Sequence, residues 1–94
     1  MELHFKPQFA KDLLNIKSHE VKVLPASYLK QIANASTISQ IGNITKLEEY
    51  ESRYKIRITV NEKDDYRLGL EIRKNIVWIE RVVRRPRFYE YYRR

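Results

Sequence analysis

The chain has 94 residues, 43% of them apolar, and a formal net charge of +7. This length supports one hydrophobic core but not two, and periodic apolar segments exclude a disordered chain. The absence of cysteine from the sequence excludes disulfides and thiolate metal sites. No segment reaches the roughly 20 apolar residues of a membrane helix, and the first residues lack a signal-peptide pattern. We therefore expect a single domain, residues 1–94, that does not enter a membrane and resides in the cytoplasm.

Positive charge is concentrated in the second half of the chain. From Arg53 to Arg94 there are thirteen lysines and arginines against six acidic residues, whereas the preceding part is balanced. An excess of this kind attracts polyanions, so the expected partners are RNA, DNA or an acidic protein segment. The two histidines, His4 and His19, have no further ligand at a metal-like spacing, so we expect neither a metal site nor a cofactor.

The N-terminal part predicts a short strand followed by a helix. Residues 3–5 form the strand, and Pro7 after it suits the first turn of a helix. Apolar residues at helical spacing then predict an amphipathic helix that continues to about Lys17. Its apolar stripe comprises Phe9, Leu13, Leu14 and Ile16.

A second helix is expected after Ser18, which is a suitable N-cap residue. Apolar residues recur there every three or four positions as far as Ala35. Pro25 complicates the assignment, because a proline inside a helix kinks or breaks it. The helix either bends at Pro25 or begins near Leu24, and we favour one kinked helix. The polar residues 35–43 then form a connection that ends in a turn.

Residues 54–60 and 66–72 predict a β-hairpin, because apolar and polar side chains alternate in both segments. The five polar residues between them have the length of a hairpin loop. The apolar face of the hairpin should pack on a core and comprises Tyr54, Ile56, Ile58, Val60, Tyr66, Leu68, Leu70 and Ile72. The opposite face carries Lys55, Arg57 and Arg67, and this is where a functional site should be sought.

Two more strands and a C-terminal segment complete the prediction. Residues 44–47 form a short strand before the hairpin, and residues 76–83 form a long one after it. The turn between the hairpin and the long strand consists of Lys74 and Asn75, with Asn75 able to adopt positive φ. The residues after Pro86 form a short helix or an extended tail. The order β-α-α-β-β-β-β predicts an α+β fold with two N-terminal helices packed on one face of a mostly antiparallel sheet.

The C-terminal segment adds cations and aromatic rings to the hairpin. Arg81 joins the cationic face if it shares the polar side of its strand, and Arg84, Arg85 and Arg87 follow in the next turn. Cations so placed repel one another unless an anion neutralises them, whereas a face decorated only for solubility would mix both signs. Tyrosines interleaved with basic residues suit base stacking combined with phosphate contacts. The pattern therefore predicts a face that binds single-stranded nucleic acid or phosphate, without naming a reaction.

These residues resemble the RelE/ParE superfamily of bacterial toxins from type II toxin–antitoxin modules, in particular the RelE-like mRNA interferases. The similarity extends over nearly the whole chain, and its specificity lies in the combination of motifs. The matching segments are Phe9-x-x-Asp12-Leu13, Ile44-Thr45-Lys46-Leu47, Tyr54-Lys55-Ile56-Arg57-Ile58, Asp65-Tyr66-Arg67-Leu68-Gly69, and Arg81-Val82-Val83-Arg84-Arg85 followed by Tyr89.

The resemblance implies a microbial-ribonuclease-like α+β fold and a metal-free endoribonuclease. In such enzymes the ribose 2′-hydroxyl attacks the adjacent phosphate of ribosome-bound mRNA. Lys55 and Arg57 match the basic pair that orients or deprotonates this hydroxyl, and Arg67 matches the arginine at the scissile phosphate. Arg85 matches the basic residue proposed as the acid or the charge stabiliser for the leaving group, and Tyr89 matches the tyrosine that stacks on a base or assists proton transfer. Four more basic residues are expected to hold the substrate: Lys46, Arg81, Arg84 and Arg87.

The resemblance also implies partners and leaves alternatives. A cognate antitoxin, mRNA and the ribosome are the expected partners, and a toxin–antitoxin hetero-oligomer is the expected assembly. A related branch of the superfamily inhibits DNA gyrase instead of cutting RNA. Arg84 stands where members of the RNA-cutting branch often have histidine, which leaves a catalytically silent RNA-binding or co-repressor protein as a further alternative.

Overall fold

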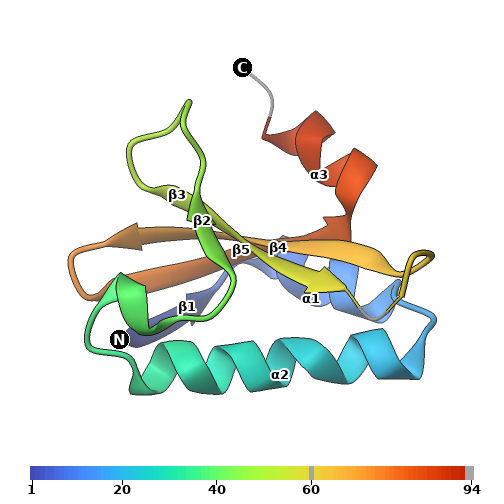
Figure 1. The fold of residues 1–94 in the computed structure, drawn as a ribbon, viewed down its shortest axis with the longest axis horizontal. Helices are drawn as coiled ribbons and strands as arrows, with labels where there is room; N and C mark the ends of the chain where they lie inside the picture. The colour runs from blue at the N-terminus through green and yellow to red at the C-terminus, as the bar shows by residue number, and fades with distance from the viewer. Residues whose placement is uncertain (60, 93–94) are drawn as a thin grey trace.

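The computed structural model describes residues 1–59 and 61–92 and has a mixed sheet between two layers of helix (Figure 1). The strands of the described residues form one five-stranded sheet in the order β1-β5-β4-β3-β2. β1 is parallel to β5, and every other neighbouring pair is antiparallel. The elements are β1 (Glu2–Phe5), α1 (Pro7–Leu14), α2 (His19–Asn34), a 3-10 turn (Ile38–Gln40), β2 (Ile44–Lys46), β3 (Arg53–Thr59), β4 (Asp65–Arg73), β5 (Ile76–Arg84) and α3 (Arg85–Tyr91). The predicted α+β architecture and element order are confirmed.

One face of the sheet, called here the helical face, packs against α1 and α2 (Figure 1). Strand alternation places the aliphatic residues of the hairpin on this face. Ile56, Leu68 and Leu70 are fully buried, and Ile58 is 1% exposed. The predicted apolar face of the hairpin therefore forms the main core, apart from Val60, which lies outside the described residues.

The first helix is shorter than the sequence predicts. α1 ends at Leu14, where Asn15 N–H bonds to the carbonyl of Lys11 and the chain turns. The turn carries Ile16 into the core but leaves Leu14 78% exposed. Leu14 is therefore not part of the buried stripe, because the helix that would have aligned it with Ile16 has already ended.

The second helix is a single element with Pro25 inside it, so the favoured assignment of one helix, and not a start near Leu24, is confirmed. The Ser18 hydroxyl accepts a hydrogen bond from the N–H of Val21 at 3.4 Å, which confirms the N-cap. In the turn between β4 and β5, however, the positive φ of 55° belongs to Lys74 and not to Asn75. No helix of the described residues is both long enough and apolar enough to cross a membrane.

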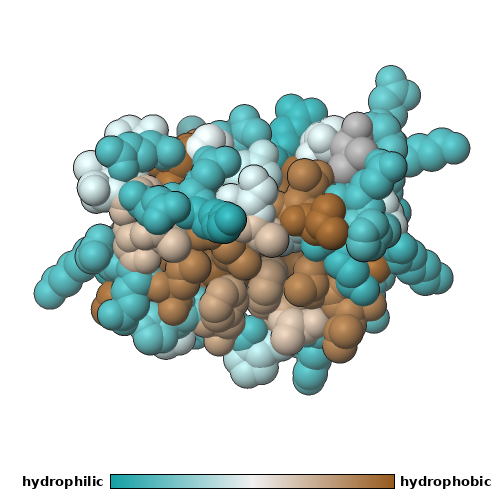
Figure 2. All heavy atoms as spheres, turned by 90° about the horizontal axis from the view of Figure 1, so that it is seen from below, coloured by the Kyte–Doolittle hydropathy of each residue, from teal (hydrophilic) through white to brown (hydrophobic). Residues whose placement is uncertain are grey.

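The outer surface of the helical layer has a broad apolar centre with hydrophilic side chains around it (Figure 2). Leu14 and Val23, at 78% and 50% exposure, are among the large apolar side chains left uncovered in the molecule. Exposed apolar area of this kind marks surfaces that associate with other molecules.

β5 contains a bulge opposite the junction of Gly69 and Leu70. Gly69 lies opposite Arg81 and Leu70 opposite Ile79, so Glu80 is the additional residue. Ile79 and Val82 both enter the main core as a result, although regular alternation would place them on opposite faces. The bulge thus changes the directions of Glu80 and Arg81 without interrupting the core.

The C-terminal segment is a helix, α3, which crosses the other face of the sheet, called here the α3 face (Figure 1). It is held by a second small core of Leu47, Val83, Phe88 and Tyr92, with Tyr50 packed against it. Phe88 is fully buried, and its ring stacks on that of Tyr92 with centroids 4.4 Å apart. This small core fixes α3 above the polar side of the hairpin.

Candidate active site

The floor of the site is the α3 face of the β3–β4 hairpin. Lys55 and Arg57 are two positions apart on β3 and share this face. Arg67 of β4 lies directly opposite Arg57 in the strand register. Together with Asn43 and Thr45, these three cations line a cavity of about 310 Å³.

α3 brings Tyr89 and Arg85 to the edge of this floor. Lys55 Nζ donates a hydrogen bond to Tyr89 Oη at 2.6 Å, and the Arg85 guanidinium carbon lies 5.7 Å from the Tyr89 ring centroid. The hydrogen bond from Lys55 lowers the pKa of Tyr89, and the positive charges of Lys55 and Arg67 lower it further against the effect of burial. The structure thus gathers the predicted catalytic residues Lys55, Arg57, Arg67, Arg85 and Tyr89 around one surface.

Arg67 is not an exposed cation as the alternation predicts. Its side chain is 6% exposed and forms an ion pair with Asp65, and its Nη1 also donates to the Tyr66 carbonyl at 3.1 Å. Its Nε is buried and has no hydrogen-bond partner among the described residues. In the strand register Arg67 lies opposite Val83 of the small core, an environment that strand alternation alone does not reveal.

Asp65 anchors both arginines of the hairpin. It pairs with Arg67 and also accepts from the Thr59 hydroxyl at 3.1 Å, while Thr59 Oγ1 accepts from Arg57 Nε at 3.2 Å. Burial opposes ionisation of Asp65, but the hydrogen bonds from Arg67 and Thr59 and the charges of both arginines outweigh it and lower the pKa of Asp65. Asp65 is therefore ionised at neutral pH and orients the two guanidinium groups.

Arg81 and Lys46, both predicted to hold substrate, lie away from this floor. The bulge directs Arg81 to α1, where it donates two hydrogen bonds to Asp12 at 2.6 and 2.8 Å and is 12% exposed. Lys46 lies opposite Tyr54 in the register, and residues in register share a face. Lys46 is therefore on the helical face, and the neighbouring Thr45 occupies the place beside Lys55.

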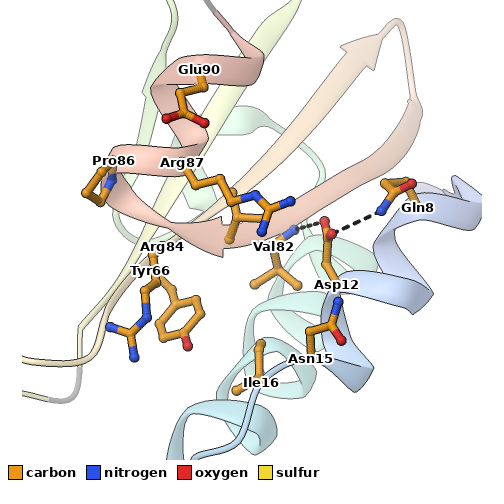
Figure 3. Close-up of a pocket in the computed structure, with 11 residues that line it drawn as sticks. Gln8, Asp12, Asn15, Ile16, Tyr66, Val82, Arg84, Pro86, Arg87 and Glu90 are labelled. Atoms are coloured by element: carbon orange, nitrogen blue, oxygen red, sulfur yellow. Dashed lines mark hydrogen bonds between the residues drawn. The ribbon is translucent and has the colours of Figure 1, made fainter.

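Arg84 and Arg87 line a separate cavity of about 540 Å³ between α1 and α3 (Figure 3). Arg84 donates to the Lys63 carbonyl at 2.5 Å, and Arg87 donates to the Tyr91 hydroxyl at 3.1 Å. Glu90 and Asp12 lie in the same cavity, so its lining carries both signs of charge. Arg81, Arg84, Arg87 and Lys46 are thus not brought together with the catalytic set.

Comparison with known proteins identifies the architecture. No family model matches the sequence. Over 93 residues the chain is 26% identical to the protein named Toxin RelE3 of Methanocaldococcus jannaschii, covering 98% of this chain and 99% of the relative. The toxin–antitoxin complex RelB-RelE from Methanococcus jannaschii contains a chain that superposes with a TM-score of 0.75 at 23% identity, covering 94% of this chain and 96% of that one. The chain has the RelE fold.

A second solved structure agrees with this assignment. The intact RelBE toxin–antitoxin complex of E. coli contains a chain that superposes with a TM-score of 0.66 at 21% identity, covering 88% of this chain and 94% of that one. The RelE-like fold that the motifs imply is therefore confirmed over almost the full length of the chain.

In this RelE fold, the site presents a set of hydrogen-bond donors. Within residues 1–59 and 61–92, no group of three His, Asp or Glu side chains could hold a metal ion. Neither histidine lies at the site, since His4 stacks on Trp78 and His19 begins α2. The fixed cations can stabilise negative charge on a phosphate, and the lowered pKa of Tyr89 makes its phenol easier to deprotonate than an ordinary tyrosine.

Sequence reasoning missed Asn43, Thr45, Thr59 and Asp65 as part of the site. Asp65 stands in the Asp-Tyr-Arg motif, so a signal for it was present, but its role as the anchor of two arginines depends on the hairpin register. Thr45 also stands in a matching segment, Ile44-Thr45-Lys46-Leu47. Its position beside Lys55, however, follows only from the pairing of β2 with β3.

Proposed function

We propose that this chain is the toxin of a type II toxin–antitoxin module and that it inhibits translation by cutting ribosome-bound mRNA. The observation that carries the proposal is the contact between Lys55 and Tyr89 beside the paired arginines of the hairpin. This arrangement offers a phosphate-binding surface next to a tyrosine whose pKa is lowered. The similarity to Toxin RelE3 supports the same assignment.

The chemistry that suits these residues is transesterification within RNA. The 2′-oxygen bonds to phosphorus as the bond from phosphorus to the 5′-oxygen breaks, which leaves a 2′,3′-cyclic phosphate and a 5′-hydroxyl. In our proposal Tyr89 acts as a phenolate, and its oxygen accepts the proton of the 2′-hydroxyl. Lys55, whose Nζ lies 2.6 Å from that oxygen, stabilises the negative charge of the phenolate. The 5′-oxygen takes a proton from water.

The arginines act on the charge that develops at phosphorus. The transition state carries more negative charge than the substrate, so fixed donors lower the barrier without reorganising. Arg57 and Arg67 hold the phosphate oxygens, and Arg85 stabilises the leaving oxygen. Arginine acts here by its charge, since it does not release its proton near neutral pH.

The proposal includes an antitoxin partner. The two solved structures compared above are complexes of a RelE-type toxin with its antitoxin. The net charge of +7 and the exposed apolar side chains of the helical layer also suit a partner that is acidic and amphipathic (Figure 2). We therefore expect a toxin–antitoxin hetero-oligomer that releases an mRNA-cutting subunit.

Induced expression tests the proposal. We expect translation to stop while DNA replication continues, with ribosome-bound mRNA shortened and free mRNA intact. Expression of Lys55→Met at the same level is the matched control and should leave mRNA intact. Blocked DNA replication with intact mRNA would contradict the proposal and favour gyrase inhibition. RNA binding without cleavage would also contradict it and favour a silent RNA-binding protein.

A further inference from the structure

The ring of Tyr92 lies directly on Gly69 of β4. A Cβ atom at position 69 would lie 2.4 Å from Tyr92 Oη and 2.8 Å from Tyr92 Cε2, closer than real atoms approach. Gly69 does not have positive φ, so its backbone would accept any residue. The glycine is therefore required by the space that Tyr92 occupies and not by the conformation of the strand.

The hydroxyl of Tyr92 is held by a buried carboxylate. Tyr92 Oη donates to Glu80 Oε1 at 3.0 Å, and Glu80 is only 8% exposed. Arg53 binds the same carboxylate through Nε at 3.0 Å and Nη2 at 3.2 Å, so the buried charge is paired. Burial and the negative charge of Glu80 raise the pKa of Tyr92, so its hydroxyl remains a donor throughout the neutral range.

This arrangement is adjacent to the Lys55–Tyr89 contact. Lys55 lies directly opposite Gly69 in the strand register. Tyr92 and Tyr89 are three residues apart at the end of α3, and the ring of Phe88 contacts both, with centroids at 4.4 and 5.4 Å. A displacement of Tyr92 would therefore move the last turns of α3 and carry Tyr89 away from Lys55.

We propose that Gly69, Glu80 and Arg53 form a clamp for Tyr92 and that this clamp positions Tyr89 against Lys55. The clamp residues are positioning residues, since they act through α3 and do not touch the reacting atoms. The bulge in β5 is what creates the clamp, because Glu80 is the additional residue that it turns toward α3. The effect of the clamp on catalysis rests on the proposed function, whereas its effect on Tyr89 does not.

The titration of Tyr89 reports on the clamp without any assumption about activity. NMR of the full chain with ring-labelled tyrosine can follow it, with Tyr89→Phe used to assign the signal. Separation from Lys55 removes the contact that lowers the pKa of Tyr89, so its midpoint should rise toward the ordinary value of about 10. We expect a large rise in Gly69→Ala, where the ring of Tyr92 must move, and a smaller one in Tyr92→Phe. Tyr91→Phe removes an exposed hydroxyl of the same helix and should leave the midpoint unchanged.

A double variant separates the clamp from general damage. In a Tyr92→Ala background, the additional change Gly69→Ala meets no ring and should produce no further shift of the Tyr89 midpoint. Such non-additive shifts of the Tyr89 midpoint are expected only if positions 69 and 92 act through one contact. An equal shift from Gly69→Ala in both backgrounds would overturn the proposal.

Cleavage of ribosome-bound mRNA gives the second readout. With Gly69→Ala we expect a loss in the rate of roughly 100-fold, the size that a misplacement of about 1 Å produces, with little change in substrate affinity. A rise of the Tyr89 midpoint in Gly69→Ala, found together with a wild-type chain that does not cleave RNA, would support the clamp and contradict the proposed function. An unchanged Tyr89 midpoint in both Gly69→Ala and Tyr92→Phe would overturn the clamp whether or not the chain cleaves RNA.

Discussion

The two faces of the sheet are held to their helices by different interactions. The helical face buries aliphatic side chains such as Leu68 and Leu70, which are fully inaccessible. Among the residues that the structure describes, the small core of the α3 face has four buried apolar or aromatic residues, and charged groups such as the Glu80–Arg53 pair lie beside them. Aliphatic packing is non-directional, whereas hydrogen bonds and ion pairs fix orientation. We conclude that the first face supplies stability and the second face supplies placement of Tyr89 and Arg85.

The largest effect on stability is expected from the helical face. Leu68→Ala removes a fully buried side chain and should lower the free energy of unfolding by about 2–5 kcal/mol. Urea unfolding measures this loss. In the fraction that remains folded, the Tyr89 titration should be unchanged, because the Leu68 side chain packs in the main core on the opposite face of the sheet from α3. A shifted Tyr89 midpoint would show that the two faces are not independent.

The largest effect on activity is expected from the α3 face. Lys55→Met removes the donor to Tyr89 Oη and should lower the rate of RNA cleavage by about 10²–10³-fold. Its unfolding free energy should fall by about 1 kcal/mol, because half-buried Lys55 loses one hydrogen bond. Lys30→Met on α2 also removes a positive charge, at an exposed position, and is the matched control. An equal loss of rate in both variants would show that net charge, and not the contact with Tyr89, is what matters.

The sequence alone predicts those features of the fold that depend on the local spacing of residues. The two faces of the hairpin and the N-cap at Ser18 follow from residue spacing and are present in the structure. The bulge is different, because Glu80 and Arg81 look like ordinary members of an alternating strand. The pairing of Arg81 with Asp12 joins residues 69 positions apart, and nothing in either segment indicates it. The burial of Arg67 likewise depends on where α3 lies.

The smallest effect on stability is expected from a change of pH that protonates Asp65. Because the pKa of Asp65 is lowered by folding, its contribution to stability is present above the unfolded pKa of about 3.9 and is lost as pH falls through the lower folded value. Asp65→Asn should therefore be less stable than the wild type at neutral pH. The difference in the free energy of unfolding between the two proteins should become smaller at acidic pH, and urea unfolding at several pH values measures it. A difference that is constant with pH would contradict the ion pair between Asp65 and Arg67.

The ends of the RNA fragments test the proposed site most directly. After brief induction, sequencing of ribosome-bound mRNA can map each break and determine the chemistry of both ends. We expect breaks within codons, with 5′-hydroxyl and 2′,3′-cyclic phosphate ends, and we expect them to disappear in Lys55→Met and Tyr89→Phe. Breaks with 5′-phosphate ends, or breaks that persist at the wild-type level in both variants, would contradict RNA cleavage at the Lys55–Tyr89 contact.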